Sequence, residues 1–162
     1  IVSDLCGIKK KSIIDSINNF IPLSHRLEKI VLKSDVNYYN DSKATNLSAT
    51  LVAINSINNN IILILGGIDK NNSDFSILEK YSHKIKNIIL YGKSRNTINN
   101  RISNFCPLFI YKDFEDAVIK SMALAEKEDN VLLSPACASF DQFNSYKERG
   151  NYFKEIIFNE YE

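Results

Sequence analysis

Short apolar segments alternate with segments of helical periodicity along most of the chain. The apolar segments predict strands at residues 27–33, 36–39, 61–65, 87–91, 108–111 and 131–133. Apolar residues spaced three or four apart predict helices at residues 47–57, 75–83, 95–102, 114–126 and 140–160. Short strands that are nearly all apolar and are separated by helices are typical of a parallel sheet covered on both faces. The pattern therefore predicts a doubly wound α/β fold with a mostly parallel, Rossmann-like sheet and helices on both faces.

The first two predicted strands are separated only by a turn at Ser34 and Asp35. They are either partners in a hairpin or neighbours in the sheet. An antiparallel edge strand is therefore an open alternative to an all-parallel sheet.

The first 22 residues precede the alternation of strands and helices. Ser12 and the apolar residues that follow it at helical spacing predict a capped short helix that ends before Pro22. The chain does not begin with methionine. We therefore expect a piece of a longer protein, with residues 1–22 as the tail of a preceding domain and residues 23–162 as one domain.

The composition of the 162 residues is that of an ordinary globular protein, with 44% hydrophobic residues, 24% charged residues and a net charge of +1. Nothing in it marks a nucleic-acid or membrane surface. The cysteines at positions 6, 106 and 137 lie too far apart for a CxxC metal site, and they do not suggest a disulfide framework. The longest apolar run, residues 61–65, is far shorter than a membrane span. We expect a cytoplasmic protein.

Polar residues gather where three of the predicted strands end, which is where open α/β sheets bind ligands. The strands at 36–39, 61–65 and 131–133 are followed by Asn40-Asp41-Ser42-Lys43-Ala44-Thr45-Asn46, Gly66-Gly67-Ile68-Asp69-Lys70 and Ser134-Pro135-Ala136-Cys137-Ala138-Ser139-Phe140-Asp141-Gln142-Phe143. The ends of two further strands, after Tyr91 and Tyr111, carry few such residues.

The chemistry of these three strand ends is that of anion binding. Lys43 and Lys70 supply positive charge, and hydroxyls come from Ser42, Thr45 and Ser139. The helix predicted to begin near Phe140 would turn its positive end to the same place. A helix cap or a tight turn explains each strand end taken alone. The three together favour a site for a small acidic ligand.

Several common catalytic motifs are absent from the sequence. There is no GxGxxG, no GxxxxGK[ST] phosphate loop and no HExxH. Cys137 is flanked by alanines and is predicted to be packed rather than nucleophilic. Of the two histidines, His25 is the better functional candidate because it adjoins Arg26 in the segment that links the two predicted domains.

Five motifs, in order along the chain, resemble the C-terminal domain of the Mur ligases, and within that family the members that add D-glutamate. The motifs are His25-Arg26-Leu27-Glu28, Asn40-Asp41-Ser42-Lys43-Ala44-Thr45-Asn46, Gly66-Gly67-Ile68-Asp69-Lys70, Leu133-Ser134-Pro135-Ala136-Cys137-Ala138-Ser139-Phe140-Asp141-Gln142-Phe143 and Glu148-Arg149-Gly150. The His-Arg-x-Glu element also occurs in folylpolyglutamate synthases. The Asp-Ser-Lys-Ala-Thr-Asn and Ser-Pro-Ala-Cys-Ala-Ser elements are much more specific to the D-glutamate-adding members.

The resemblance implies an ATP-dependent, amide-forming ligase of peptidoglycan synthesis. ATP would phosphorylate the L-alanyl carboxylate of UDP-N-acetylmuramoyl-L-alanine, and the amine of D-glutamate would attack the acyl phosphate. In the family this domain binds D-glutamate and closes over the nucleotide. The phosphate loop, the Mg²⁺ ligands and the uridine-nucleotide site belong to domains outside this chain. The resemblance thus implies no metal site here, a monomeric enzyme, and no activity of this piece alone.

Carried over by motif, the resemblance implies ATP contacts for His25, Arg26, Asp41 and Lys43, with Lys43 near the phosphates as the catalytic residue. It implies that the D-glutamate carboxylates are held by Thr45, Lys70, Ser139 and the backbone near Phe140 and Tyr146. At the last two positions the family commonly has other apolar or aromatic residues. Because those contacts are partly made by the backbone, we expect little effect.

Two alternatives to a D-glutamate ligase remain open. In the first, the domain is part of another amino-acid ligase of the Mur or folylpolyglutamate type. In the second, it is a stand-alone module that binds an anion or an amino acid. An acceptor assay separates the first alternative from the D-glutamate ligase. The gene boundary upstream of Ile1 separates the second.

Overall fold

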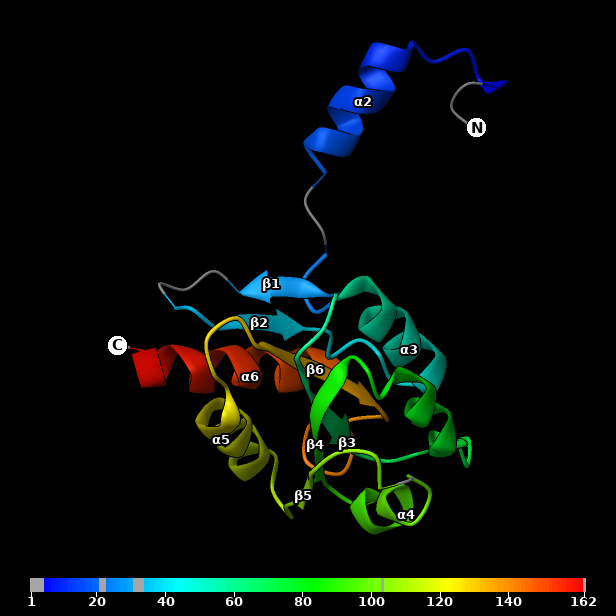
Figure 1. Cartoon of the computed structure of the whole chain (residues 1–162). Helices are drawn as coiled ribbons and strands as arrows, with labels where there is room; N and C mark the ends of the chain where they lie inside the picture. The colour runs from blue at the N-terminus through cyan, green and yellow to red at the C-terminus, as the bar shows by residue number, and fades with distance from the viewer. Residues whose placement is uncertain (1–4, 21–22, 31–33, 103, 162) are drawn as a thin grey trace.

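The computed structural model describes residues 5–20, 23–30, 34–102 and 104–161 and contains one six-stranded sheet. The strands lie in the order β1-β2-β6-β3-β4-β5, and only the β1–β2 pair is antiparallel (Figure 1). Their bounds are Glu28–Ile30, Asn37–Asn40, Ile61–Gly66, Ile85–Tyr91, Leu108–Ile110 and Asn130–Ala136 for β1 to β6. The predicted mostly parallel sheet is confirmed, with the antiparallel strand at its edge.

Helices cover both faces of the sheet. They are α3 (Leu47–Ser56), the 3₁₀ helix η1 (Phe75–Tyr81), α4 (Arg95–Asn99), α5 (Phe114–Leu124) and α6 (Tyr146–Tyr161). The alternating residues of β3 divide between two cores, since Leu63 packs with α3, η1 and α4 while Ile64 packs with α5 and α6. Every residue of β3 is buried. This burial on both faces explains why the strand is apolar without alternation. Among the described helices, none is long and apolar enough to cross a membrane.

The strand order brings together the three strand ends that are rich in polar residues. The chain passes from β2 through α3 to β3, and the last strand, β6, then inserts between these two. Parallel strands end at the same edge of a sheet, so the segments after β2, β6 and β3 are neighbours. The plain ends of β4 and β5 lie to one side. The reversal of strand order falls at the point where ligands bind in such folds.

Four details of the prediction are wrong. Residues 75–81 form a 3₁₀ helix, in which the buried Phe75 and Leu78 suit three residues per turn. The last helix begins at Tyr146, because the backbone carbonyl of Ser139 accepts hydrogen bonds from the amides of Gln142 and Phe143 in a turn. Strand β6 runs on to Ala136, three residues beyond the predicted end, because the sheet also buries the polar Ser134. Residues 140 and 141 lie in a turn, so no helix opens at Phe140. The fourth detail concerns the first helix.

Helix α2 (Lys10–Asn18) begins two residues before Ser12, and no side chain caps it. None of its residues is buried, and it lies apart from the sheet (Figure 1). The existence of the predicted helix is confirmed, whereas its predicted cap is wrong. Its assignment to a preceding domain stays a prediction. Residues 31–33 of the first predicted strand lie outside the described residues.

Candidate functional site

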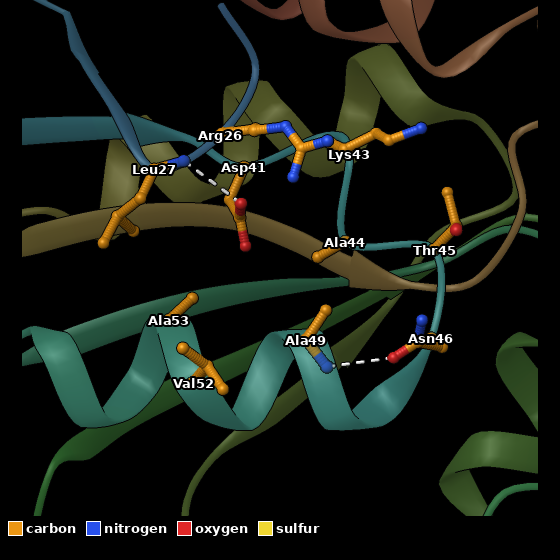
Figure 2. Close-up of a pocket in the computed structure, with 10 residues that line it drawn as sticks. All are labelled: Arg26, Leu27, Asp41, Lys43, Ala44, Thr45, Asn46, Ala49, Val52 and Ala53. Carbon is orange, nitrogen blue, oxygen red and sulfur yellow. Dashed lines mark hydrogen bonds between the residues drawn. The ribbon is translucent and has the colours of Figure 1, made fainter. Parts of the chain in front are cut away.

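A cavity of about 520 Å³ lies between the segment after β2 and helix α3. Its polar side is formed by Arg26, Asp41, Lys43 and Thr45, and the remaining lining residues are Leu27, Ala44, Asn46, Ala49, Val52 and Ala53. Figure 2 shows the polar side chains above the small side chains of α3. Asn46 begins this helix, since its Oδ1 accepts a hydrogen bond of 2.9 Å from the amide of Ala49. The cavity therefore combines two cations and a carboxylate with an apolar floor.

The loop before β1 presents Arg26 to this cavity. His25 and Leu27, on either side of Arg26, have positive φ angles of 65° and 47°. Such a conformation is unusual for residues other than glycine and persists only where surrounding contacts fix it. The Leu27 amide donates to Asp41 Oδ1 at 3.1 Å, and the amide of Lys43 donates to the His25 carbonyl at 3.0 Å. The loop is thus bonded directly to the segment after β2.

Asp41 lines the cavity, but both of its carboxylate oxygens already accept hydrogen bonds from the protein. Oδ2 accepts from the hydroxyl of Ser134 at 2.8 Å, and Oδ1 accepts from Leu27. Ser134 also bonds to the hydroxyl of Thr50, on α3, at 3.0 Å. Burial raises the pKa of Asp41 above its ordinary value. Asp41 therefore joins β2, β6 and the Arg26 loop, and its predicted contact with ATP stays a prediction.

His25 precedes Arg26 but is not among the residues that line the cavity. Only 5% of it is exposed, and its Nδ1 lies 3.0 Å from the side-chain nitrogen of Asn40. Burial lowers the pKa of His25. The same Asn40 nitrogen donates to the carbonyl of Gly150 on α6 at 3.0 Å. His25 thus connects the Arg26 loop to Asn40 and, through it, to α6, and its contact with ATP likewise stays a prediction.

The segments after β3 and β6 form a second group of predicted ligand residues. The amide and carbonyl of Ile68 bond to the carbonyl and amide of Ala138, at 2.8 and 3.0 Å. A Cβ atom at Gly67, whose φ is +120°, would lie 2.2 Å from the Ala138 carbonyl oxygen. The glycine is therefore required for this close approach. Lys70 Nζ lies 4.9 Å above the ring of Phe140, beside the buried Ser139.

The two groups meet at the start of α6. Lys43 Nζ lies 4.1 Å from the centre of the Tyr146 ring, and the hydroxyl of Ser42 donates to the Tyr146 carbonyl at 2.8 Å. Thr45 belongs to the cavity, whereas the other four residues predicted for D-glutamate do not line it. The structure thus brings all the predicted residues to one edge of the sheet, in two adjoining groups.

Arg149 stands out in the sequence only as part of the closing motif, yet it is the largest fully buried side chain. It donates hydrogen bonds to Ser42 after β2, to Cys137 after β6 and to Tyr91, the last residue of β4. The spacing of residues along α6 indicates this burial. Arg149 precedes the buried Phe153 and Ile157 by four and eight residues, so all three lie on the inward face of α6.

The prediction that Cys137 is packed rather than nucleophilic is confirmed. Cys137 is buried, and burial raises the pKa of its thiol to about 12, so it is packed and protonated. Within the residues that the structure describes, no cluster of three or more His, Cys, Asp or Glu side chains could hold a metal ion.

Residues 25–137 match the model of a protein family described as Mur ligase, glutamate ligase domain. The chain belongs to this family. The match covers three of the five motifs and the first five residues of the fourth, and it includes the whole lining of the cavity and, from the second group of ligand residues, Lys70.

Relatives of this Mur ligase domain carry the name UDP-N-acetylmuramoylalanine–D-glutamate ligase. The protein from Bdellovibrio bacteriovorus is 40% identical over 151 residues, which cover 93% of this chain and 33% of the relative. That from Hydrogenobaculum is 41% identical over 93% of this chain and 36% of its own length. That from Chlamydia pneumoniae is 39% identical over 97% of this chain and 38% of its own length. The chain thus spans little more than a third of the curated relatives it matches.

Solved structures share the fold at lower identity. The MurF ligase from Thermotoga maritima, in complex with ADP, superimposes with a TM-score of 0.67 at 14% identity, over 98% of this chain and 36% of that one. A pseudomurein peptide ligase type C from Methanothermus fervidus superimposes with a TM-score of 0.68 at 19% identity, over 97% of this chain and 33% of that one. These likenesses show the fold.

Proposed function

We propose that this Mur ligase domain is the D-glutamate-binding part of a longer ATP-dependent ligase of peptidoglycan biosynthesis. The enzyme adds D-glutamate to UDP-N-acetylmuramoyl-L-alanine through an acyl phosphate. The observation that carries the proposal is the strand order, which gathers the segments after β2, β6 and β3, with their lysines and hydroxyls, at one edge of the sheet. The names of the relatives at about 40% identity support the choice of substrate.

In the proposed reaction this domain positions two ligands. Arg26 and Lys43 turn toward the nucleotide phosphates, while Lys70, Thr45 and Ser139 hold the carboxylates of D-glutamate. Lys43 adds positive charge where the transferring phosphate becomes more negative, which lowers the barrier to its transfer. Fixing the D-glutamate amine beside the acyl phosphate lowers the entropic part of the next barrier. The domain thus contributes geometry and charge, and it is inactive alone.

The other parts of the reaction are proposed to lie outside residues 23–162. The family match begins at residue 25, which supports a domain boundary near residue 23, with residues 1–22 as the tail of a central ATPase domain. ATP is bound mainly by that domain, which also supplies the ligands of Mg²⁺. The ADP in the Thermotoga maritima MurF complex supports the use of ATP. The intact enzyme is proposed to act as a monomer in the cytoplasm.

A comparison of acceptors tests the proposal. The intact protein that contains this chain is given UDP-N-acetylmuramoyl-L-alanine and ATP with D-glutamate, L-glutamate or L-lysine, and phosphate release and product are measured. We expect product with D-glutamate alone. A preference for either other amino acid would assign the domain to another ligase of the superfamily. Binding of D-glutamate without ligation would indicate an amino-acid-binding module.

A further inference from the structure

The side chain of Arg149 connects the two groups of ligand residues from inside the domain. We infer that Arg149 is a positioning residue, which holds the nucleotide side and the amino-acid side of the site in one fixed geometry. The inference rests on the proposed function, because it assigns a role within that same site.

The guanidinium of Arg149 uses its whole set of N–H groups. Nε donates to Ser42 Oγ at 2.9 Å, and Nη2 donates to the Ser42 carbonyl at 2.8 Å. Nη1 donates to the hydroxyl of Tyr91 at 3.0 Å, and both terminal nitrogens donate to the Cys137 carbonyl at 3.2 Å. These five bonds match the five N–H groups that a guanidinium possesses. Its planar fork therefore joins the segments after β2 and β6 at a fixed separation.

Two of the three partners of Arg149 lie close in sequence to proposed ligand residues, whereas Tyr91 lies on β4. Ser42 precedes Lys43 directly, and Cys137 precedes Ser139 by two residues. The Ser42 hydroxyl, which accepts from Arg149, donates in turn to the carbonyl of Tyr146. A displacement of the guanidinium would therefore shift Lys43, Ser139 and Tyr146 together.

The charge of Arg149 supports a role beyond packing. Among the described residues, no carboxylate lies within ion-pair distance of it, and all of its hydrogen-bond acceptors are neutral oxygens. Removing a cation from water without an anionic partner is unfavourable, and a well-packed apolar side chain often stabilises a core as well or better. An unpaired positive charge beneath an anion site, by contrast, favours the binding of phosphate and carboxylate groups.

The test uses Arg149→Lys in the intact protein. A lysine keeps the charge, but its single ammonium cannot bridge the Ser42 and Cys137 carbonyls as the fork does. We expect KM for D-glutamate and KM for ATP to rise together, each by about tenfold, because small misplacements of binding groups have large effects. The matched control is Ile157→Ala, on the same inward face of α6 and fully buried. It should lower the unfolding midpoint and leave both KM values unchanged.

A rise in one KM alone, or a lower midpoint with both KM values unchanged, would overturn the inference. If the unmodified protein fails to ligate D-glutamate, the proposed function fails instead. Should Arg149→Lys not fold, Ser42→Ala serves as the second variant, because it removes one acceptor of Arg149 and the bond to Tyr146 while keeping the Ser42 carbonyl. It is expected to raise both KM values by a smaller factor, and unchanged values would contradict the positioning role.

Discussion

Replacing Gly150 by alanine tests the packing between α6 and the Arg26 loop. Gly150 lies within α6 and does not have a positive φ angle, so helix propensity alone predicts a gain of about 1 kcal/mol in stability. The structure predicts the opposite sign. The new Cβ atom would lie 2.3 Å from His25 Nδ1 and 3.0 Å from Asn40 Oδ1. Neither side chain can move freely, because the two are hydrogen-bonded to each other and Asn40 is also bonded to the Gly150 carbonyl.

The size of the effect follows from these contacts. Overpacking a buried position costs about 1–3 kcal/mol, and each hydrogen bond that is lost costs about 0.5–1.5 kcal/mol. After subtracting the gain in helix propensity, we expect a net loss of about 1–3 kcal/mol. In a domain of this size, 1 kcal/mol corresponds to about 2–4 °C in the unfolding midpoint. The midpoint of the transition that includes this domain should therefore fall by several degrees.

The assay is calorimetry of the intact protein, with Asn151→Ala as the control. Asn151 is the next residue of α6 and is exposed, so its substitution should leave the midpoint unchanged or slightly raised. KM for ATP should also rise in Gly150→Ala, because the loop that presents Arg26 is displaced with His25. If the midpoint of Gly150→Ala rises as in the control, the close packing of His25 against α6 is refuted.

Two further predictions concern local interactions. Burial lowers the pKa of His25 below the ordinary value of 6.5. The folded state therefore binds the proton less readily than the unfolded state. The stability that the neutral ring contributes is lost as the pH falls below about 6.5. His25→Asn, which tolerates the positive φ angle, should show a smaller decline in urea midpoint between pH 7 and 5 than the unmodified protein; parallel declines would contradict this source of pH dependence. Asn46→Ala removes the cap of α3 and should lower the free energy of unfolding, measured in urea, by about 1 kcal/mol. Ser48→Ala, in the same exposed turn, should leave the free energy of unfolding nearly unchanged. Equal losses would argue against the cap.

The sequence predicts the alternation of strands and helices well, because each strand is short and bounded by polar residues. It also identifies the three chemically rich strand ends. The position of β6 between β2 and β3 is not encoded locally, since strand order depends on the packing of distant segments. The chemistry of the strand ends nevertheless indicates which strands are neighbours, because the three ends that are rich in polar residues belong to the adjacent strands β2, β6 and β3.

Other features of the site depend on contacts between segments far apart in the sequence. The start of α6 at Tyr146 rather than Phe140 depends on a turn that closes on the Ser139 carbonyl. The burial of His25 depends on Asn40 and on the small size of Gly150. The sequence indicates His25 as a contact of ATP, which stays a prediction, but it gives no sign that the His25 ring is buried against α6.

The central claim is that the segments after β2, β3 and β6 together hold D-glutamate, and the affinity of Lys70→Ala for D-glutamate tests it most directly. The matched control is Lys93→Ala, which removes an exposed lysine from the plain end of β4 at the same edge of the sheet. A charge-assisted hydrogen bond contributes about 1.5–3 kcal/mol, so KM for D-glutamate in the intact protein should rise by about 10- to 100-fold in Lys70→Ala. It should stay unchanged in Lys93→Ala. An unchanged KM in Lys70→Ala, or an equal rise in both variants, would contradict the account.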